Sequence, residues 1–173
     1  MAPGLKYGLI AATGMGGWML GEYAFGLHTT RISLAHYTSW GTEVILIIAL
    51  WRLLNHHTNA VGRYWLPVWE GLMHGIVASV VAAMGFYVIF SLYVNFLHPD
   101  FPDLYLDWSV AHMRALGTPE VEIREAAHAF RWSMGPVGLP LTILGQYLLV
   151  GLIASPVLTL WLNWRRKEPV HRG

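Results

Sequence analysis

Four long apolar stretches constrain the fold of this sequence more than any other feature. They run over residues 5–27, 34–54, 65–97 and 134–162, and few charged residues interrupt them. A helix of about 20 mostly apolar residues crosses the hydrocarbon core of a bilayer. Helices are also one of the few structures that satisfy every backbone polar group there. The sequence therefore predicts an all-α integral membrane protein, a bundle of four transmembrane helices.

Composition agrees with this class of protein. The 173 residues are 55% hydrophobic and 12% charged, without cysteine, whereas soluble domains carry about 25% charged residues. Such a chain is neither disordered nor stapled by disulfides, and it has no thiolate metal site. Its net charge of +1 and scattered basic residues argue against nucleic-acid binding. We expect one membrane domain over residues 1–173, with the first stretch retained as a helix rather than removed as a signal peptide.

The distribution of basic residues predicts an orientation. Cytoplasmic loops of membrane proteins are enriched in lysine and arginine. With a cytoplasmic N-terminus, the inner side holds seven of them and the outer side four. The inner group is Lys6, Arg52, Arg63, Arg165, Arg166, Lys167 and Arg172, and the outer group is Arg31, Arg114, Arg124 and Arg131. The sequence therefore predicts that both termini are cytoplasmic.

Small residues four positions apart predict how the helices pack. Helices associate in a bilayer through close contacts at such residues. The candidates lie in the first, third and fourth stretches, and they are Gly8, Gly16, Gly17, Gly21, Gly71, Gly75, Ser79 and Gly151. A compact four-helix bundle accounts for most of them. Four helices cannot bury every small-residue face, so one face is available to another membrane subunit or to a second copy of the chain.

The long segment 98–133 reads as two short amphipathic helices outside the membrane. Pro102 suits the first turn of one helix, and Gly117 suits its end. The sequence Thr118-Pro119-Glu120 is typical of a helix start, with Thr118 as the capping residue. Apolar side chains on these helices are candidates for docking a partner protein. They are Leu104, Trp108, Phe130 and Trp132.

Several short motifs recur in one known family. In chain order they are Lys6-Tyr7-Gly8-Leu9-Ile10, Asn95-Phe96, Pro99-Asp100-Phe101, residues 117–123, Val150-Gly151-Leu152-Ile153 and Arg165-Arg166-Lys167. The chain thereby resembles a domain-of-unknown-function family of small bacterial four-helix inner-membrane proteins. The resemblance implies a multi-pass protein of a bacterial inner membrane, and it supplies no reaction. Residues 55–59 and 64–67 depart from the lysine-rich loop usual in that family.

Three carboxylates and one histidine fall within the apolar stretches. They are Glu22, Glu43, Glu70 and His74, and placing such a group in a bilayer costs about 2.5–3.5 kcal/mol on insertion scales. Glu43 is predicted near the middle of the second stretch, and Glu22 about 9 Å outward from the middle of the first. If the two carboxylates met, they could hold a proton or a cation between them. Alternatively, each is a hydrogen-bonded packing group.

Metal and pigment sites have weak support. Glu125 and His128 have the Glu-x-x-His spacing of di-metal bundles, but such sites need two of these units and two further glutamates. We therefore expect neither a metal nor a cofactor. Haem or a chlorophyll-type pigment bound by His74 is a lower-ranked alternative. Hydrolase, phosphate-loop and zinc-protease motifs are missing, so catalytic residues are not expected.

Two functions follow from these patterns. The first is a non-enzymatic accessory or scaffolding subunit that packs against a larger membrane complex. A bioenergetic complex is one candidate for this assembly. The second is a small proton- or cation-coupled transporter that works as a homo-oligomer through Glu22 and Glu43. The expected partners are the lipid bilayer and other membrane subunits. The absence of a clear inverted repeat counts against transport.

Overall fold

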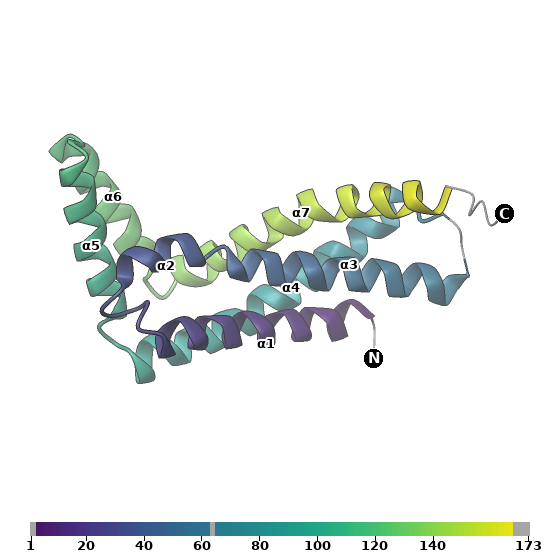
Figure 1. Cartoon of the computed structure of the whole chain (residues 1–173), viewed down its shortest axis with the longest axis horizontal. Helices are drawn as coiled ribbons and strands as arrows, with labels where there is room; N and C mark the ends of the chain where they lie inside the picture. Colours follow the sequence, from purple (N-terminus) through teal and green to yellow (C-terminus); the bar gives the residue numbers. More distant parts are fainter. Residues whose placement is uncertain (1–2, 63–64, 168–173) are drawn as a thin grey trace.

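The computed structural model describes residues 3–62 and 65–167, which form helices joined by short connections (Figure 1). No strand occurs within these two ranges, which confirms the predicted all-α class. The α-helices are α1 (Pro3–Ala24), α2 (Ile32–Thr38), α3 (Gly41–Val61), α4 (Val68–Leu92), α5 (Phe101–Ala115), α6 (Glu120–Ser133) and α7 (Gly138–Lys167). A π-helical turn, η1 (Tyr93–Leu97), continues α4.

Four long helices form an elongated bundle. α4 packs against α1 and α7, and α3 packs against the same two helices. α1 and α4 run in one direction, and α3 and α7 run in the other (Figure 1). α5 and α6 form an antiparallel hairpin that projects from one end of the bundle, where α2 also lies. We call this the hairpin end, and we call the opposite end, where α1 begins and α7 finishes, the terminal end.

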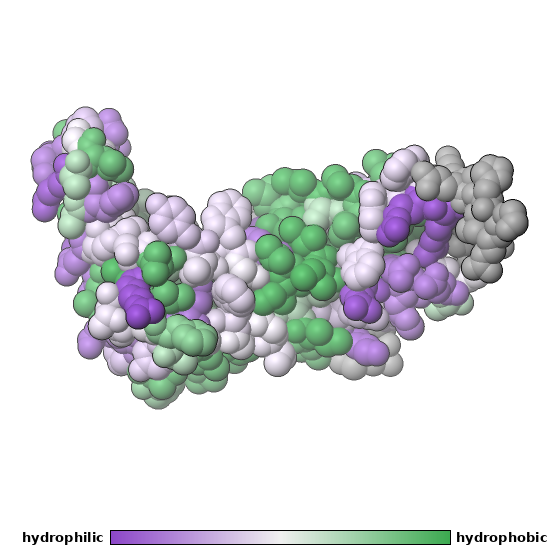
Figure 2. Space-filling view, in the orientation of Figure 1, coloured by the Kyte–Doolittle hydropathy of each residue, from purple (hydrophilic) through white to green (hydrophobic). Residues whose placement is uncertain are grey.

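Two of the long helices have the length and apolarity needed to cross a membrane. They are α4 with its π-helical extension, over Val68–Leu97, and α7, over Gly138–Arg166. The other two long helices are less apolar, because α1 contains several glycines and α3 contains Glu43, Arg52 and two histidines. Hydrophobic residues gather over the middle of the bundle, and more polar surface flanks them at both ends (Figure 2).

The second apolar stretch does not form one helix. It is divided into α2 and α3, with a turn at Ser39 and Trp40. Trp18 of α1 fixes this break, because its Nε1 donates to the carbonyl of Thr38 at 3.0 Å and its ring lies against Gly41, where a Cβ would overlap it. Glu43 therefore lies in the first turn of α3. The prediction that Glu43 lies near the middle of a span is wrong.

The two helices predicted in the segment 98–133 are confirmed. α5 has Pro102 in its first turn, and Gly117, with a φ of 77°, lies in the left-handed region just beyond its end. The residue that precedes α6 is Pro119 rather than Thr118, and no side chain caps the helix. α5 and α6 lie beyond the hairpin end of the bundle and run across the direction of its long helices (Figure 1).

Small residues bring α4 and α7 into very close contact. A Cβ on Gly75 would overlap the Ser155 hydroxyl, one on Gly71 would overlap the Thr159 hydroxyl, and one on Gly151 would overlap the Ser79 hydroxyl. We call these six residues the α4–α7 seam. Three of the predicted packing glycines and Ser79 thus meet a partner helix, as small-residue pairing requires.

The glycines of α1 divide into two groups. A Cβ on Gly8 would come within 2.7 Å of Ala78 and Val81, and one on Gly16 within 2.8 Å of Ile89, so both pack against α4. By contrast, Gly17 and Gly21 have no neighbour within 4 Å of such a Cβ among the described residues. Gly17 and Gly21 therefore leave open space beside α1 within the described part of the chain.

Candidate functional site

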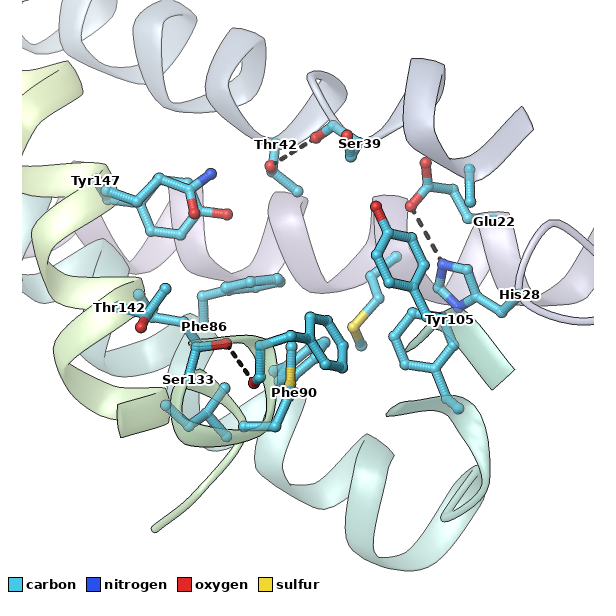
Figure 3. Close-up of a pocket in the computed structure, with 18 residues that line it drawn as sticks. Glu22, His28, Ser39, Thr42, Phe86, Phe90, Tyr105, Ser133, Thr142 and Tyr147 are labelled. Atoms are coloured by element: carbon cyan, nitrogen blue, oxygen red, sulfur yellow. Dashed lines mark hydrogen bonds and ion pairs between the residues drawn. The ribbon is translucent and has the colours of Figure 1, made fainter. Parts of the chain in front are cut away.

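A cavity of about 310 Å³ opens at the hairpin end, and every α-helix of the described chain contributes to its lining (Figure 3). The lining residues are Met19, Glu22, His28, Ala35, Ser39, Thr42, Phe86, Phe90, Phe101, Tyr105, Phe130, Ser133, Met134, Leu139, Thr142, Ile143, Gln146 and Tyr147. Most ligand pockets combine apolar and aromatic walls with a few convergent polar groups. This cavity has the same composition.

Aromatic rings make up much of the wall. Phe86 of α4 meets Tyr147 of α7 edge to face, with ring centroids 5.6 Å apart. Tyr105 of α5 stacks on Phe130 of α6 at 5.7 Å, with 20° between the rings, and so joins the two helices of the hairpin. Burial raises the pKa of the Tyr105 phenol, which therefore stays protonated at neutral pH.

Glu22 supplies the carboxylate of the cavity. It lies in the last turn of α1 and is 8% exposed. Its Oε2 is 3.5 Å from Nε2 of His28, while its Oε1 is buried with no hydrogen-bond partner among the residues that the structure describes. Buried polar atoms almost always have a partner, because an unpaired one forfeits its hydration. The unpaired Oε1 is therefore an exception that needs a reason.

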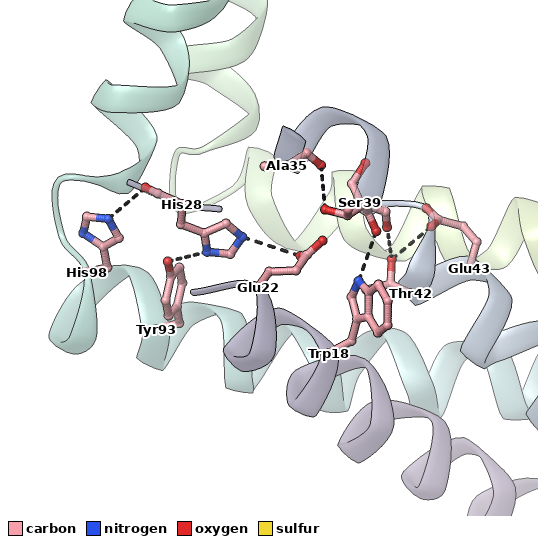
Figure 4. Close-up of polar contacts among 10 residues, drawn as sticks. Trp18, Glu22, His28, Ala35, Ser39, Thr42, Glu43, Tyr93 and His98 are labelled. Atoms are coloured by element: carbon pink, nitrogen blue, oxygen red, sulfur yellow. Dashed lines mark hydrogen bonds and ion pairs between the residues drawn. The ribbon is translucent and has the colours of Figure 1, made fainter. Parts of the chain in front are cut away.

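A glycine turn after α1 brings His28 back to Glu22. Gly26 has a φ of 74°, which favours glycine, and the N–H of Leu27 donates to the Glu22 carbonyl at 2.9 Å. The His28 ring is 4% exposed and lies between the Glu22 carboxylate and the Tyr93 phenol (Figure 4). The chain reversal thus brings His28 into contact with Glu22, and both side chains are buried.

The contact continues from His28 to Tyr93. His28 Nδ1 and Tyr93 Oη are 2.6 Å apart, and His98 Nε2 is 3.2 Å from the His28 carbonyl oxygen (Figure 4). A neutral His28 with its proton on Nε2 can accept the Tyr93 hydroxyl at Nδ1 while Nε2–H faces Glu22. In this tautomer both ring nitrogens of His28 face a polar partner.

Glu43 belongs to a different set of contacts. Its Oε2 accepts the Thr42 hydroxyl at 3.0 Å, and its Oε1 accepts the amide of Gln146 from α7. Thr42 and Gln146 line the cavity, whereas Glu43 does not. Glu22 and Glu43 therefore both lie at the hairpin end but have different partners.

Glu70 and His74 lie near the opposite end of the bundle, in the first two turns of α4. His74 Nε2 is 3.2 Å from Nε2 of His57 on α3. Glu125 and His128 lie on the exposed surface of α6. Over residues 3–62 and 65–167, no three His, Cys, Asp or Glu side chains come together as a metal site.

Comparison with known protein families assigns this chain to one of them. A model of proteins of unknown function, DUF4199, matches residues 6–163. The chain belongs to the DUF4199 family. The matched region includes every residue that lines the cavity. No curated protein and no solved structure matches the chain.

The predicted docking residues of this DUF4199 member have different surroundings in the structure. Leu104 and Trp132 are 43% and 55% exposed. Trp108 stacks on His112 of its own helix, with ring centroids 5.2 Å apart. Phe130 instead faces Tyr105 and lines the cavity. Phe130 is therefore part of the cavity wall, and the other three lie outside it.

Sequence reasoning missed most of the cavity. It singled out Glu22 and Phe130, but it did not pair Glu22 with His28 or connect His28 to Tyr93. Tyr147 was not among the candidates either. Gly26 between Glu22 and His28 was the one local signal, because a glycine just after a helix end indicates a reversal of the chain. The remaining contacts join segments distant in sequence.

Proposed function

We propose that the chain is a four-span integral membrane protein of a bacterial inner membrane with cytoplasmic termini, and that it binds a small molecule in the hairpin-end cavity without transforming it. α1, α3, α4 and α7 are the proposed spans. α5 and α6 lie at the outer surface of the membrane. The observation that carries the binding function is that Glu22 lines the cavity while its buried Oε1 has no hydrogen-bond partner among the described residues.

Helix lengths and surface composition support four spans. The four long helices have 21 to 30 residues, or about 32–45 Å, enough for a hydrocarbon core of about 30 Å. Large aliphatic side chains face outward on each of them, such as Ile10, Ile48, Val88 and Ile153, which are 51–61% exposed. Because α1 and α3 pack beside α4 and α7, all four share the same depth.

The position of Tyr93 favours binding over catalysis. Glu22, His28 and Tyr93 form a row of polar contacts, which resembles the rows that activate hydroxyl nucleophiles. However, Tyr93 is 2% exposed and does not line the cavity. The hydroxyl at the far end of the row is thus remote from a bound molecule, whereas the carboxylate is beside it.

Single introduced cysteines test the topology, since the natural chain has none. We expect Glu122→Cys in α6 to react with a membrane-impermeant maleimide on intact cells. Asn59→Cys near the terminal end should react only after permeabilisation, and Ile153→Cys in α7 should resist labelling. Rapid labelling of Ile153→Cys in intact membranes, with the protein folded, would contradict a span at α7.

Two glycines on an open face of α1 favour a second function, that of an accessory subunit. Gly17 and Gly21 have open space beside them within the described chain, and small residues on a lipid-facing helix permit close approach of another transmembrane helix. The expected partner is a helix of a different membrane protein. Mild-detergent purification should yield a complex of fixed stoichiometry that Gly17→Ile disrupts. A monomer, or a homo-oligomer unaffected by this substitution, would refute it.

A further inference from the structure

We propose that the hairpin-end cavity binds a small organic cation, an amine or quaternary ammonium group with an apolar substituent, and that Glu22 is its counter-ion. This inference rests on the proposed binding function and names the chemical class of the ligand. Three properties of the cavity carry it: the state of the Glu22 carboxylate, the aromatic wall, and the size of the space.

The carboxylate is the first property. Glu22 lines the cavity, and its Oε1 is buried without a hydrogen-bond partner among the described residues. No lysine or arginine is found among the described residues that line the cavity. His28 Nε2 is 3.5 Å from the other oxygen, Oε2. A carboxylate is poorly tolerated in an apolar site, so a positively charged ligand would gain most from the Glu22 carboxylate. An anion would be repelled by it.

The aromatic wall is the second property. Six of the lining residues are phenylalanine or tyrosine, and they come from α4, α5, α6 and α7. Aromatic faces attract ammonium groups within about 6 Å of the ring centroid, and quaternary ammonium ligands are bound in aromatic cages of this kind. Glu22 lies at one end of the cluster and Tyr147 at the other (Figure 3). The rings would therefore surround the ligand while Glu22 neutralises its charge.

The size and donor set of the cavity exclude other cations. About 310 Å³ is near the lower limit for ligand pockets, so it suits a compact molecule. Metal ions such as Ca²⁺ require about six to eight oxygen ligands. Glu22 is the one carboxylate among the described lining residues, and most of the others are apolar. The cavity is therefore better matched to an organic cation than to a metal ion.

Titration of the full-length protein in detergent with benzyltrimethylammonium tests the proposal. This cation carries its charge at every pH, and neopentylbenzene is its neutral isostere. We expect the wild type to bind the cation at least tenfold more tightly than the isostere. Glu22→Gln should weaken cation binding at least tenfold, while Glu70→Gln, the same change far from the cavity, should leave it unchanged.

Phe130→Leu provides a second test that does not depend on Glu22. It should weaken binding of the cation more than binding of the isostere, because only the cation gains from the ring face. Equal binding of both probes would overturn the cation assignment and leave the binding function standing. Binding of the isostere alone would do the same. If neither probe binds folded wild-type protein, the cation assignment and the binding function both fail.

Discussion

The α4–α7 seam and the hairpin-end cavity involve the same two helices but pack them in opposite ways. At the seam, Gly75 and Ser155 approach so closely that a single added methyl group would overlap. Toward the hairpin end, Phe86 and Tyr147 replace these small residues and meet edge to face. Small residues leave no space between the helices, whereas large rings leave about 310 Å³ beside them.

This difference shows how a small bundle can hold a cavity open. Rings alone would collapse together, because buried apolar surface favours the densest packing. The seam fixes α4 against α7 over two turns on one side of the rings. On the other side, the α5–α6 hairpin, joined by the Tyr105–Phe130 stack, meets α4 where Phe101 contacts Phe90. We therefore expect substitutions at the seam to change stability and substitutions in the cavity to change binding.

Gly75→Ala should have the largest effect on stability. Its methyl group would overlap Ser155, and overpacking of this kind costs about 1–3 kcal/mol. Gly21→Ala is the matched control, because it adds the same methyl group to open space. Thermal unfolding in detergent should show a lowered midpoint for Gly75→Ala alone. Recovery on addition of Ser155→Gly would confirm the contact, and equal midpoints for the two alanine variants would contradict it.

A pair of alanine-to-leucine substitutions should separate the two regions next. Ala35→Leu fills the cavity, so it should abolish binding of benzyltrimethylammonium with little loss of stability. Ala82 of α4 is fully buried in the core, so Ala82→Leu should lower the free energy of unfolding by about 1–3 kcal/mol, and with it the unfolding midpoint. Binding titrations and thermal unfolding measure both. The expectation fails if Ala35→Leu is the more destabilising variant.

Tyr93→Phe should have a moderate effect. It removes the 2.6 Å contact with His28 Nδ1 and leaves that nitrogen buried, at a cost of about 1–3 kcal/mol. Because Tyr93 does not line the cavity, the affinity for the cation should change much less than in Glu22→Gln. A loss of affinity as large as that of Glu22→Gln, in a folded variant, would show that Tyr93 contacts the ligand.

The ion pair between Arg114 and Glu120 should have the smallest effect. Arg114 Nε donates to Glu120 Oε1 at 2.7 Å, and this hydrogen bond lowers the pKa of Glu120 below its ordinary 4.5. A lowered folded-state pKa adds stability that is present above the ordinary value and disappears as the pH falls through the lowered one. In Glu120→Gln, this loss of stability below pH 4.5 should disappear. The effect should be small, because salt screens an ion pair at the surface. Identical acid profiles would exclude it.

The sequence predicted the long helices better than the site. The apolar runs located α4 and α7 to within a few residues, because helix length and apolarity are local properties. The break between α2 and α3 was missed, since residues 34–54 read as one continuous run and the break depends on Trp18 from another helix. Likewise, Glu22 was a candidate from the start, but its neighbour His28 is linked to Tyr93 across 65 residues.

The most direct test of the central claim is a crystal structure of the protein with 4-bromobenzyltrimethylammonium. Anomalous scattering from bromine distinguishes the probe from water, lipid and detergent, because the signal is specific to that element. We predict one strong peak inside the hairpin-end cavity, with the ammonium group beside the Glu22 carboxylate and within about 6 Å of a ring centroid of the aromatic wall. A peak elsewhere on the bundle, or an ammonium group directed away from Glu22, would contradict the claim.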